Sequence, residues 1–211
     1  MKKILVALLM LSLSVAIIGC SNKPEGNPQD VIEAYYSFIH SADYESAYDL
    51  LSDTLKKDVD LDEFINWNDL LTLVHENDEY KFTLLEETED EKLEGNEFSS
   101  INKFKVNKSW ISLYSDKQEI DNNEEYVVSE DKEWKVYRLK KDFNIDEKIA
   151  NIYNQLGWMY YEGKGESLDM NKAIEMFSNS VEYDDYHYYH YSLAVALEEM
   201  NRFDESPYVL G

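Results

Sequence analysis

Two histidines near the C-terminal end have the clearest metal-ligand spacing in the chain. His187 and His190 lie three residues apart, which places both imidazoles on one face of a helix, beside Asp184 and Asp185. The spacing suits zinc or copper, but a zinc site usually has four ligands, and no cysteine or third histidine is nearby. We therefore predict no metal site and no cofactor.

A second candidate site is the alternating run Asp58, Asp60 and Asp62, which has the carboxylate spacing of a calcium-binding loop. Glu63 stands where that loop needs a glycine, and Asp69 stands where its last glutamate belongs. Asp60 and Glu63 instead have the spacing of a helix capping box. We predict a helix start here, and loose binding of cations by the acidic surface remains an alternative function.

Residues suited to catalysis are sparse. His40 and His75 are each isolated near an expected helix end, with no fixed partner that would make either one a general base. The sequence has no glycine-rich phosphate loop and no serine elbow motif. We expect both histidines at the surface or at helix caps, and we predict that the chain is not an enzyme.

The composition is strongly acidic, with a formal net charge of -24 over 211 residues. Nucleic-acid binding is excluded, because no basic stripe is present to neutralise phosphates. The net charge also argues against electrostatic adhesion to anionic lipids, because their headgroups repel so acidic a chain. The hydrophobic fraction of 44% and the 17 tyrosines predict a folded chain, since disordered segments are poor in aromatic residues.

The first twenty residues have the pattern of an export signal. Lys2 and Lys3 precede an apolar run, Ile4 to Ile18, which is short for a membrane span but typical of a signal peptide. The run ends in Gly19 and Cys20 and resembles the bacterial lipobox. This resemblance implies cleavage after Gly19 and a diacylglycerol thioether on Cys20. An ordinary signal peptide that ends near a cysteine by chance is the alternative.

These assignments divide the N-terminal part into a lipoprotein signal peptide, 1–19, and a short polar tether, 20–28. More than one acyl chain is needed for stable anchoring. We therefore expect the mature chain on the extracytoplasmic face of the cell membrane, held there through lipid on Cys20.

Residues 29–141 change from helical to alternating hydrophobic patterns. Apolar residues recur at helical spacing first, and helix starts are expected at Pro28, Asp43 and Asp60. From Tyr80 onward apolar residues alternate as in strands. Charged turns between strands are expected at 86–96 and 116–125. Helices followed by antiparallel strands predict an α+β domain in which the helices pack on a curved sheet.

The segment from Pro28 to Ser52, PQDVIEAYYSFIHSADYESAYDLLS, resembles the opening helical hairpin of lipoprotein domains with the cone-shaped fold of nuclear transport factor two. The sequence EWKV, at 133–136, resembles the closing strand of such domains. The resemblance implies a pocket. Trp67, Trp110 and Trp134 are expected to line that pocket or, alternatively, to belong to the core. Such folds include enzymes and inert modules, so the fold alone assigns no chemistry.

Residues 144–211 are expected to be helical. Asn144 and Glu147 have capping spacing before a helix that ends at Glu162, and Asp169 is placed to cap the next helix. The string from Leu156 to Phe177, LGWMYYEGKGESLDMNKAIEMF, resembles a tetratricopeptide helix pair of the Sel-like type. A second copy is incomplete. One and a half repeats cannot bury their faces alone. They must lean on the sheet domain or be completed by a partner, unless the gene is truncated.

In that repeat family, the first helix of each pair lines a concave binding surface. Carried over by position, the resemblance implies the partner-binding residues Asn151, Asn154, Trp158, Tyr161, Glu162, Tyr188, Tyr191 and Glu198. Aromatic rings beside carboxylates suit a protein or peptide partner of basic character. The alternative is that these rings are buried against the neighbouring domain.

The leader and the repeat together predict a membrane-anchored lipoprotein of the cell envelope that acts as a protein-interaction module. A different function is also compatible with the sequence. The pocket of the cone-like domain would bind a small molecule or, less readily, turn one over.

Overall fold

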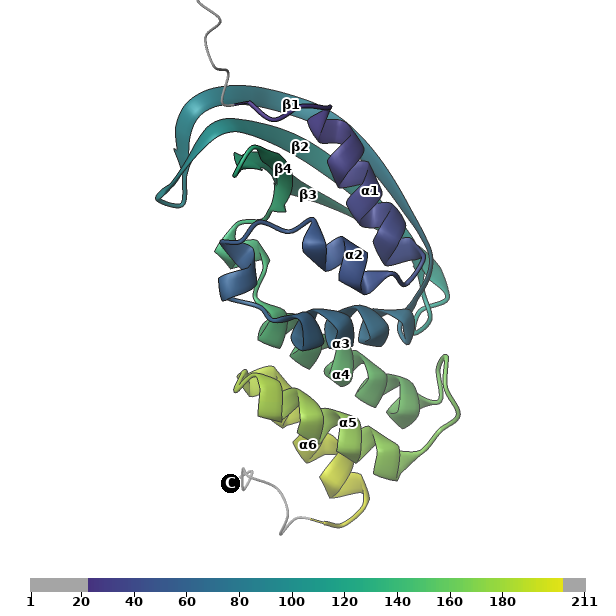
Figure 1. Cartoon of the computed structure of the whole chain (residues 1–211). Coiled ribbons are helices and arrows are strands. Elements are labelled where there is room, and N and C mark those ends of the chain that lie inside the picture. The colour runs from purple at the N-terminus through teal and green to yellow at the C-terminus, as the bar shows by residue number, and fades with distance from the viewer. Residues whose placement is uncertain (1–22, 203–211) are drawn as a thin grey trace, which may run out of the picture.

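The computed structural model describes residues 23–202, which form a mixed α+β structure (Figure 1). One antiparallel sheet has the strand order β1-β2-β3-β4. Its strands are β1 (His75–Leu93), β2 (Asn96–Ser112), β3 (Lys117–Glu130) and β4 (Glu133–Tyr137). The α+β class predicted from the sequence is confirmed.

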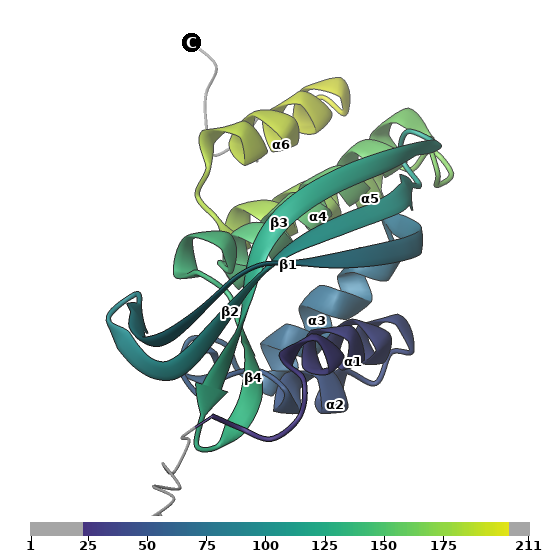
Figure 2. The ribbon, with the colours of Figure 1, turned by 90° about the horizontal axis from the view of Figure 1, so that it is seen from above.

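Six α-helices accompany the sheet within this part of the chain. They are α1 (Pro28–His40), α2 (Tyr44–Asp49), α3 (Leu61–Thr72), α4 (Ile145–Glu162), α5 (Met170–Tyr183) and α6 (His187–Glu199). Short 3-10 turns, η1 (Leu55–Lys57) and η2 (Lys140–Asp142), complete the order. In Figures 1 and 2, α1 and α6 lie at opposite ends of the molecule.

Local capping signals account for most helix starts. Pro28 occupies the first turn of α1, the Asp43 side chain accepts a hydrogen bond from Ser46 N, and Asp60 forms a full capping box with Glu63. The capping box expected at Asn144 and Glu147 does not form. Asn144 is the N-cap residue of α4, but its side chain accepts no hydrogen bond there.

The expected turns at 86–96 and 116–125 are wrong. Residues 86–93 continue β1, with Glu91 paired to Phe98, and 117–125 belong to β3. The true turn between β1 and β2 is Glu94-Gly95, where both residues have positive φ. The charged stretches are mostly exposed on both faces, so neither face carries the apolar alternation that identifies a strand.

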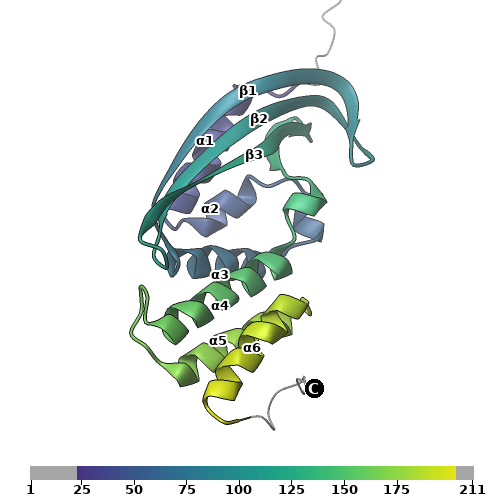
Figure 3. The same ribbon diagram turned by 180° about the vertical axis from the view of Figure 1, so that it is seen from behind.

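The sheet bends over α1 and α2, and the main core lies between these layers (Figures 1 and 3). Phe64 from α3, Phe104 from β2 and Tyr137 from β4 are fully buried in this core. Residues on one side of α4, including Ile149 and Leu156, belong to the same core. The C-terminal helical segment therefore shares the core of the sheet-containing part through α4.

Two glycines permit close packing around α4. A Cβ at Gly157 would stand 2.4 Å from the ring of Phe177 on α5, so α4 and α5 approach closely only because the side chain is absent. Gly165 has a φ of +75°, and a Cβ there would stand 2.4 Å from the carbonyl oxygen of Leu113. The loop between α4 and α5 thus contacts the end of β2. Ala173, Phe177 and Leu197 form a second, smaller core between α5 and α6.

Candidate functional site

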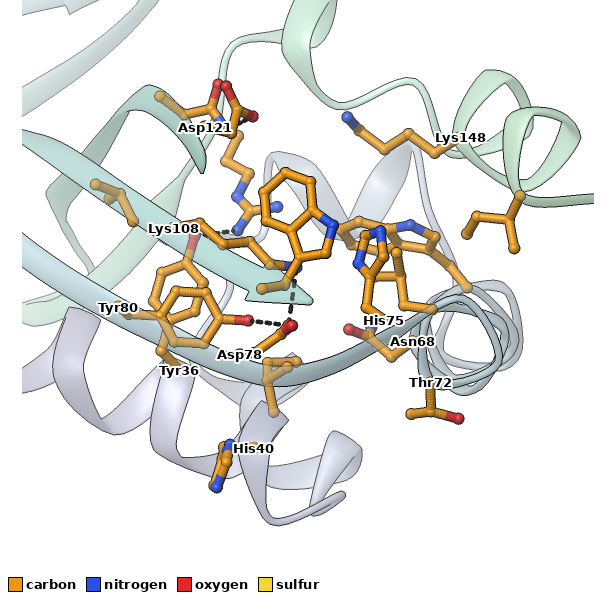
Figure 4. Close-up of a pocket in the computed structure, with 18 of the residues that line it drawn as sticks. Tyr36, His40, Asn68, Thr72, His75, Asp78, Tyr80, Lys108, Asp121 and Lys148 are labelled. Carbon is orange, nitrogen blue, oxygen red and sulfur yellow. Dashed lines mark hydrogen bonds and ion pairs between the residues drawn. The ribbon is translucent and has the colours of Figure 1, made fainter. Parts of the chain in front are cut away.

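A cavity of about 630 Å³ is lined by residues of α1, α3, α4 and the first three strands (Figure 4). Its wall contains both charged and aromatic side chains. Figure 4 shows Lys148 reaching from α4, and Asp78 lying between Tyr80 and His75. Charged and aromatic side chains from distant parts of the sequence therefore meet in one place.

A buried ion pair forms one part of the wall. Arg138 Nη2 lies 3.0 Å from Glu125 Oε1, and the two side chains are 11% and 5% exposed. The Tyr36 hydroxyl donates to the same carboxylate, and Arg138 donates to the Tyr36 oxygen at 2.8 Å. Burial lowers the pKa of Arg138, but the Glu125 carboxylate, together with Tyr35 and Tyr36, more than offsets burial and holds that pKa above its usual range. The guanidinium stays charged.

The turn geometry of the β3–β4 hairpin brings this pair together. Asp131 and Lys132 both have positive φ, as a two-residue hairpin turn requires, and Tyr126 pairs with Tyr137. Continuing that register by one residue places Arg138 opposite Glu125. The sequence pattern did not predict this pair, although Arg138 is one of only two arginines in the chain.

A second ion pair joins β1 to β2. Lys108 Nζ lies 2.9 Å from Asp78 Oδ2, which also accepts the Tyr80 hydroxyl at 3.0 Å. The Tyr80 ring packs on Tyr36 with 4.2 Å between centroids, so the two ion pairs share an aromatic wall. Asp78 lies where the β1–β2 register shifts, directly after Asn77 at φ +55°. This irregularity was not visible in the sequence pattern.

His75 lies in the cavity wall, at the start of β1. The expectation of a surface or capping residue is therefore wrong for this histidine. Its ring packs on Trp110, with 4.8 Å between centroids and 33° between planes. Burial, reinforced by the charge of Lys108, lowers the pKa of His75 to about 4. The imidazole is thus neutral at pH 7. His40 also lines the cavity and is exposed at the end of α1.

Several buried polar atoms of this wall have no hydrogen-bond partner within residues 23–202. They are His75 Nδ1, Asp78 Oδ1, Trp110 Nε1, Glu125 Oε2 and Arg138 Nε. Buried polar atoms in folded proteins are nearly always satisfied by protein groups or by water. A wall with this many free donors and acceptors is suited to holding a polar molecule.

Trp67 and Trp110 line this cavity, as the sequence analysis allowed. Trp134 does not. It is buried at the far side of the sheet-containing core, where its indole N–H donates to the Gly26 carbonyl oxygen at 3.3 Å. Trp134 therefore anchors the segment before α1.

A second hollow, of about 400 Å³, lies along the next stretch of α4. Its lining residues are Tyr114, Asn151, Asn154, Gln155, Trp158, Glu162 and Tyr188. We call this hollow the α4–α6 groove. Five of the eight residues expected to bind a partner line it. Tyr161 lies beside it, with its ring 5.2 Å from that of Trp158. Tyr191 and Glu198 are exposed on α6 and do not line it.

Two buried polar atoms of the groove are unsatisfied within the described part of the chain. They are the side-chain oxygen of Asn154, a residue that is 7% exposed, and the indole N–H of Trp158. Glu162 is already engaged, because it accepts the Tyr114 hydroxyl at 2.9 Å and pairs with Lys164 at 2.6 Å. Trp158 is half-buried, and its ring packs on Phe177 as well as lining the groove. It is therefore both a packing residue and a groove residue.

The histidine pair on α6 does not converge on one point. His190 Nε2 contacts Asp185 at 2.5 Å, whereas His187 is exposed and packs on Tyr186. Residues 23–202 hold no cluster of three His, Cys, Asp or Glu side chains placed to bind a metal ion. In the same span, no helix has the length and hydrophobicity required to cross a bilayer.

Comparison with protein-family models, with curated proteins and with solved structures finds no match for this chain.

Proposed function

We propose that this chain is a non-enzymatic lipoprotein, anchored to the extracytoplasmic face of the cell membrane, that binds a partner protein through the α4–α6 groove. One observation carries the binding part of this proposal. Five side chains selected from the sequence for partner binding lie around one hollow, together with Tyr114 from the turn after β2. Asn154 and Trp158 add an unsatisfied acceptor and an unsatisfied donor, which suit the N–H and C=O groups of a polypeptide.

The anchor is the lipid on Cys20, which lies outside the described residues. The described chain begins close to this cysteine, at Lys23, and α1 begins at Pro28. A tether of this length holds the folded part near the bilayer surface. The acidity of the chain supports a lipid anchor rather than electrostatic adhesion, because anionic headgroups repel it.

The proposal includes two family assignments. The bent sheet that covers α1 and α2 supports a cone-like domain of the nuclear-transport-factor-two type at 29–141. Close packing of Gly157 on Phe177, followed by the loop that contains Gly163 and Gly165, supports a Sel-like repeat at 144–211. An incomplete repeat is stabilised here by packing α4 against α3 and the sheet core.

A pull-down from solubilised envelope tests the function. The bait is the chain from residue 21, which keeps every described helix and strand, and the comparison is the Trp158→Ala variant. We expect a discrete partner with the parent and a reduced yield with the variant. Glu97→Gln, an exposed change on β2, is the matched control that retains the partner. Equal recovery of all proteins with the three baits would refute the proposal.

A second candidate function is the binding of a small polar molecule in the 630 Å³ cavity. The specific observation that favours it is the buried Arg138–Glu125 pair, whose Nε and Oε2 atoms remain unsatisfied within the described residues. A thermal-shift screen with small amines, acids and sugars tests this candidate. Stabilisation by one chemical class alone supports it, and absence of any shift at millimolar concentration rejects it.

A further inference from the structure

The cavity and the α4–α6 groove meet on α4. Asn151 and Gln155 line both hollows. Along α4, the cavity extends toward Glu147 and Lys148, and the groove extends toward Trp158. Because the two hollows share Asn151 and Gln155, they adjoin each other along α4, and an elongated ligand is suited to extending from one into the other. The cavity is then the deep end of a longer cleft whose open end lies between α4 and α6.

The cavity wall carries an excess of negative charge. Seven carboxylates line it, against three lysines and one arginine. Asp78 and Glu125 already neutralise Lys108 and Arg138. The acidic lining residues that remain are Glu76, Glu119, Asp121, Asp142 and Glu147, and the basic ones are Lys141 and Lys148. This balance attracts a cation and repels an anion.

Two carboxylate oxygens of the wall lack a hydrogen-bond donor among the described residues. Glu125 Oε2 belongs to a side chain that is only 5% exposed, and Asp78 Oδ1 belongs to the neighbouring ion pair. A buried carboxylate oxygen without a donor is costly, and a charged N–H group is its strongest partner. An alkylammonium or guanidinium group is suited to satisfying such an oxygen, because each carries several N–H donors.

We infer that the cavity receives the charged end of a lysine or arginine side chain from a peptide partner whose backbone lies in the α4–α6 groove. This inference rests on the proposed function and names the chemistry of the partner. Asn154 Oδ1 accepts a backbone N–H of the peptide, and Trp158 Nε1 donates to a backbone carbonyl. The long, flexible stem of a basic side chain spans the junction at Asn151 and Gln155.

Calorimetric titration of the full chain, purified from membranes in detergent, tests this inference with two peptides. The first is acetyl-GSGKGSG-amide, and the second carries acetyl-lysine at the central position, which keeps the aliphatic stem and lacks the charge. Agmatine, a free amine and guanidine, serves as the third probe. We expect the lysine peptide to bind at least about tenfold more tightly than its acetylated form, because only the former has the charge.

Substitutions in the cavity and in the groove test the contributions of the two halves of the cleft separately. Asp78→Asn removes the carboxylate charge whose Oδ1 atom has no donor among the described residues, while keeping an acceptor for Tyr80. It should weaken binding of both the lysine peptide and agmatine by roughly tenfold. Trp158→Phe should weaken the peptide and leave agmatine unchanged. Glu97→Gln, which neutralises an exposed carboxylate outside both hollows, should change neither. Unchanged thermal unfolding of each variant shows that the fold is intact.

The inference is overturned if the two peptides bind alike, or if none of the probes binds at millimolar concentration. Agmatine binding as tightly as the peptide, with no effect of Trp158→Phe, also overturns it, because the cavity then holds a free organic cation. None of these results determines whether the pull-down recovers a partner. A partner recovered through the groove without any preference for basic peptides would reject this inference and retain the proposed function.

Discussion

Glu125 and Arg138 face each other across the β3–β4 hairpin and form an ion pair at 3.0 Å in the wall of the 630 Å³ cavity. The hydrophobic pattern of the sequence does not predict a functional role for either residue. The pair connects the end of the sheet to α1 through the Tyr36 hydroxyl, which contacts both partners. It therefore contributes to stability as well as to the chemistry of the cavity.

Removing one member of this pair should destabilise the fold. In Arg138→Met the Glu125 carboxylate stays buried without its cation, and the free energy of unfolding should fall by about 3–5 kcal/mol. Neutralising both residues, in Glu125→Gln with Arg138→Met, should recover much of that loss. Urea unfolding of the single and double variants measures the difference. A loss below about 1 kcal/mol in Arg138→Met would show that the pair is not buried as described.

The neutral state of His75 predicts acid sensitivity. Because burial and Lys108 lower the pKa of His75 to about 4, the unfolded chain takes up a proton below its ordinary pKa of about 6.5, whereas the folded chain does not. Stability from this group is present above pH 6.5 and is lost as the pH falls toward 4. His75→Gln should flatten the dependence of unfolding free energy on pH in this window by roughly 1–3 kcal/mol.

The exposed His40 on α1 provides the control for that measurement. His40→Gln gives the effect of removing an exposed imidazole from the same chain. Parallel curves for the parent and His75→Gln would contradict the position of His75 in the cavity wall.

Packing between α4 and α5 depends on Gly157. Alanine in a helix is normally favoured over glycine by about 1 kcal/mol. Here the added Cβ would stand 2.4 Å from the Phe177 ring, so Gly157→Ala should instead lower the free energy of unfolding by about 2 kcal/mol. Thermal unfolding measures this change. In a Phe177→Leu background the same substitution should cost less, and an equal cost in both backgrounds would exclude the clash.

Lipidation predicts the location of the chain. Cells grown with radioactive palmitate should label the parent and leave Cys20→Ala unlabelled, because Cys20 provides the only thiol in the sequence. The variant should also leave the membrane fraction. Label retained on Cys20→Ala would contradict the anchor.

Elements with local signals were predictable, whereas contacts that depend on register were not. Pro28, Asp43 and the Asp60–Glu63 box begin helices through neighbours in sequence, so their positions follow from residue type. The charged parts of β1 and β3 were missed because strand pairing continues there without a buried face. Backbone pairing leaves no hydrophobic pattern when both faces meet solvent.

The same distinction between local sequence signals and strand register applies to the residues of the two hollows. Groove residues on α4 recur at helical spacing, so residues on one face could be selected from the sequence alone. The cavity required knowledge of the β3–β4 register for Glu125 and of the β1 irregularity for Asp78. A two-residue turn at Asp131 and Lys132 was the one signal that could have placed Arg138 opposite Glu125.

Site-specific photocrosslinking in intact cells tests the central claim most directly. A benzophenone side chain replaces Tyr188 in the α4–α6 groove or, as the control, Ile120 on β3, which is 68% exposed and lies outside both hollows. We predict a discrete crosslinked partner in the membrane fraction from position 188 and none from position 120. Identical patterns from the two positions, or no crosslink from position 188, would contradict a partner-binding groove.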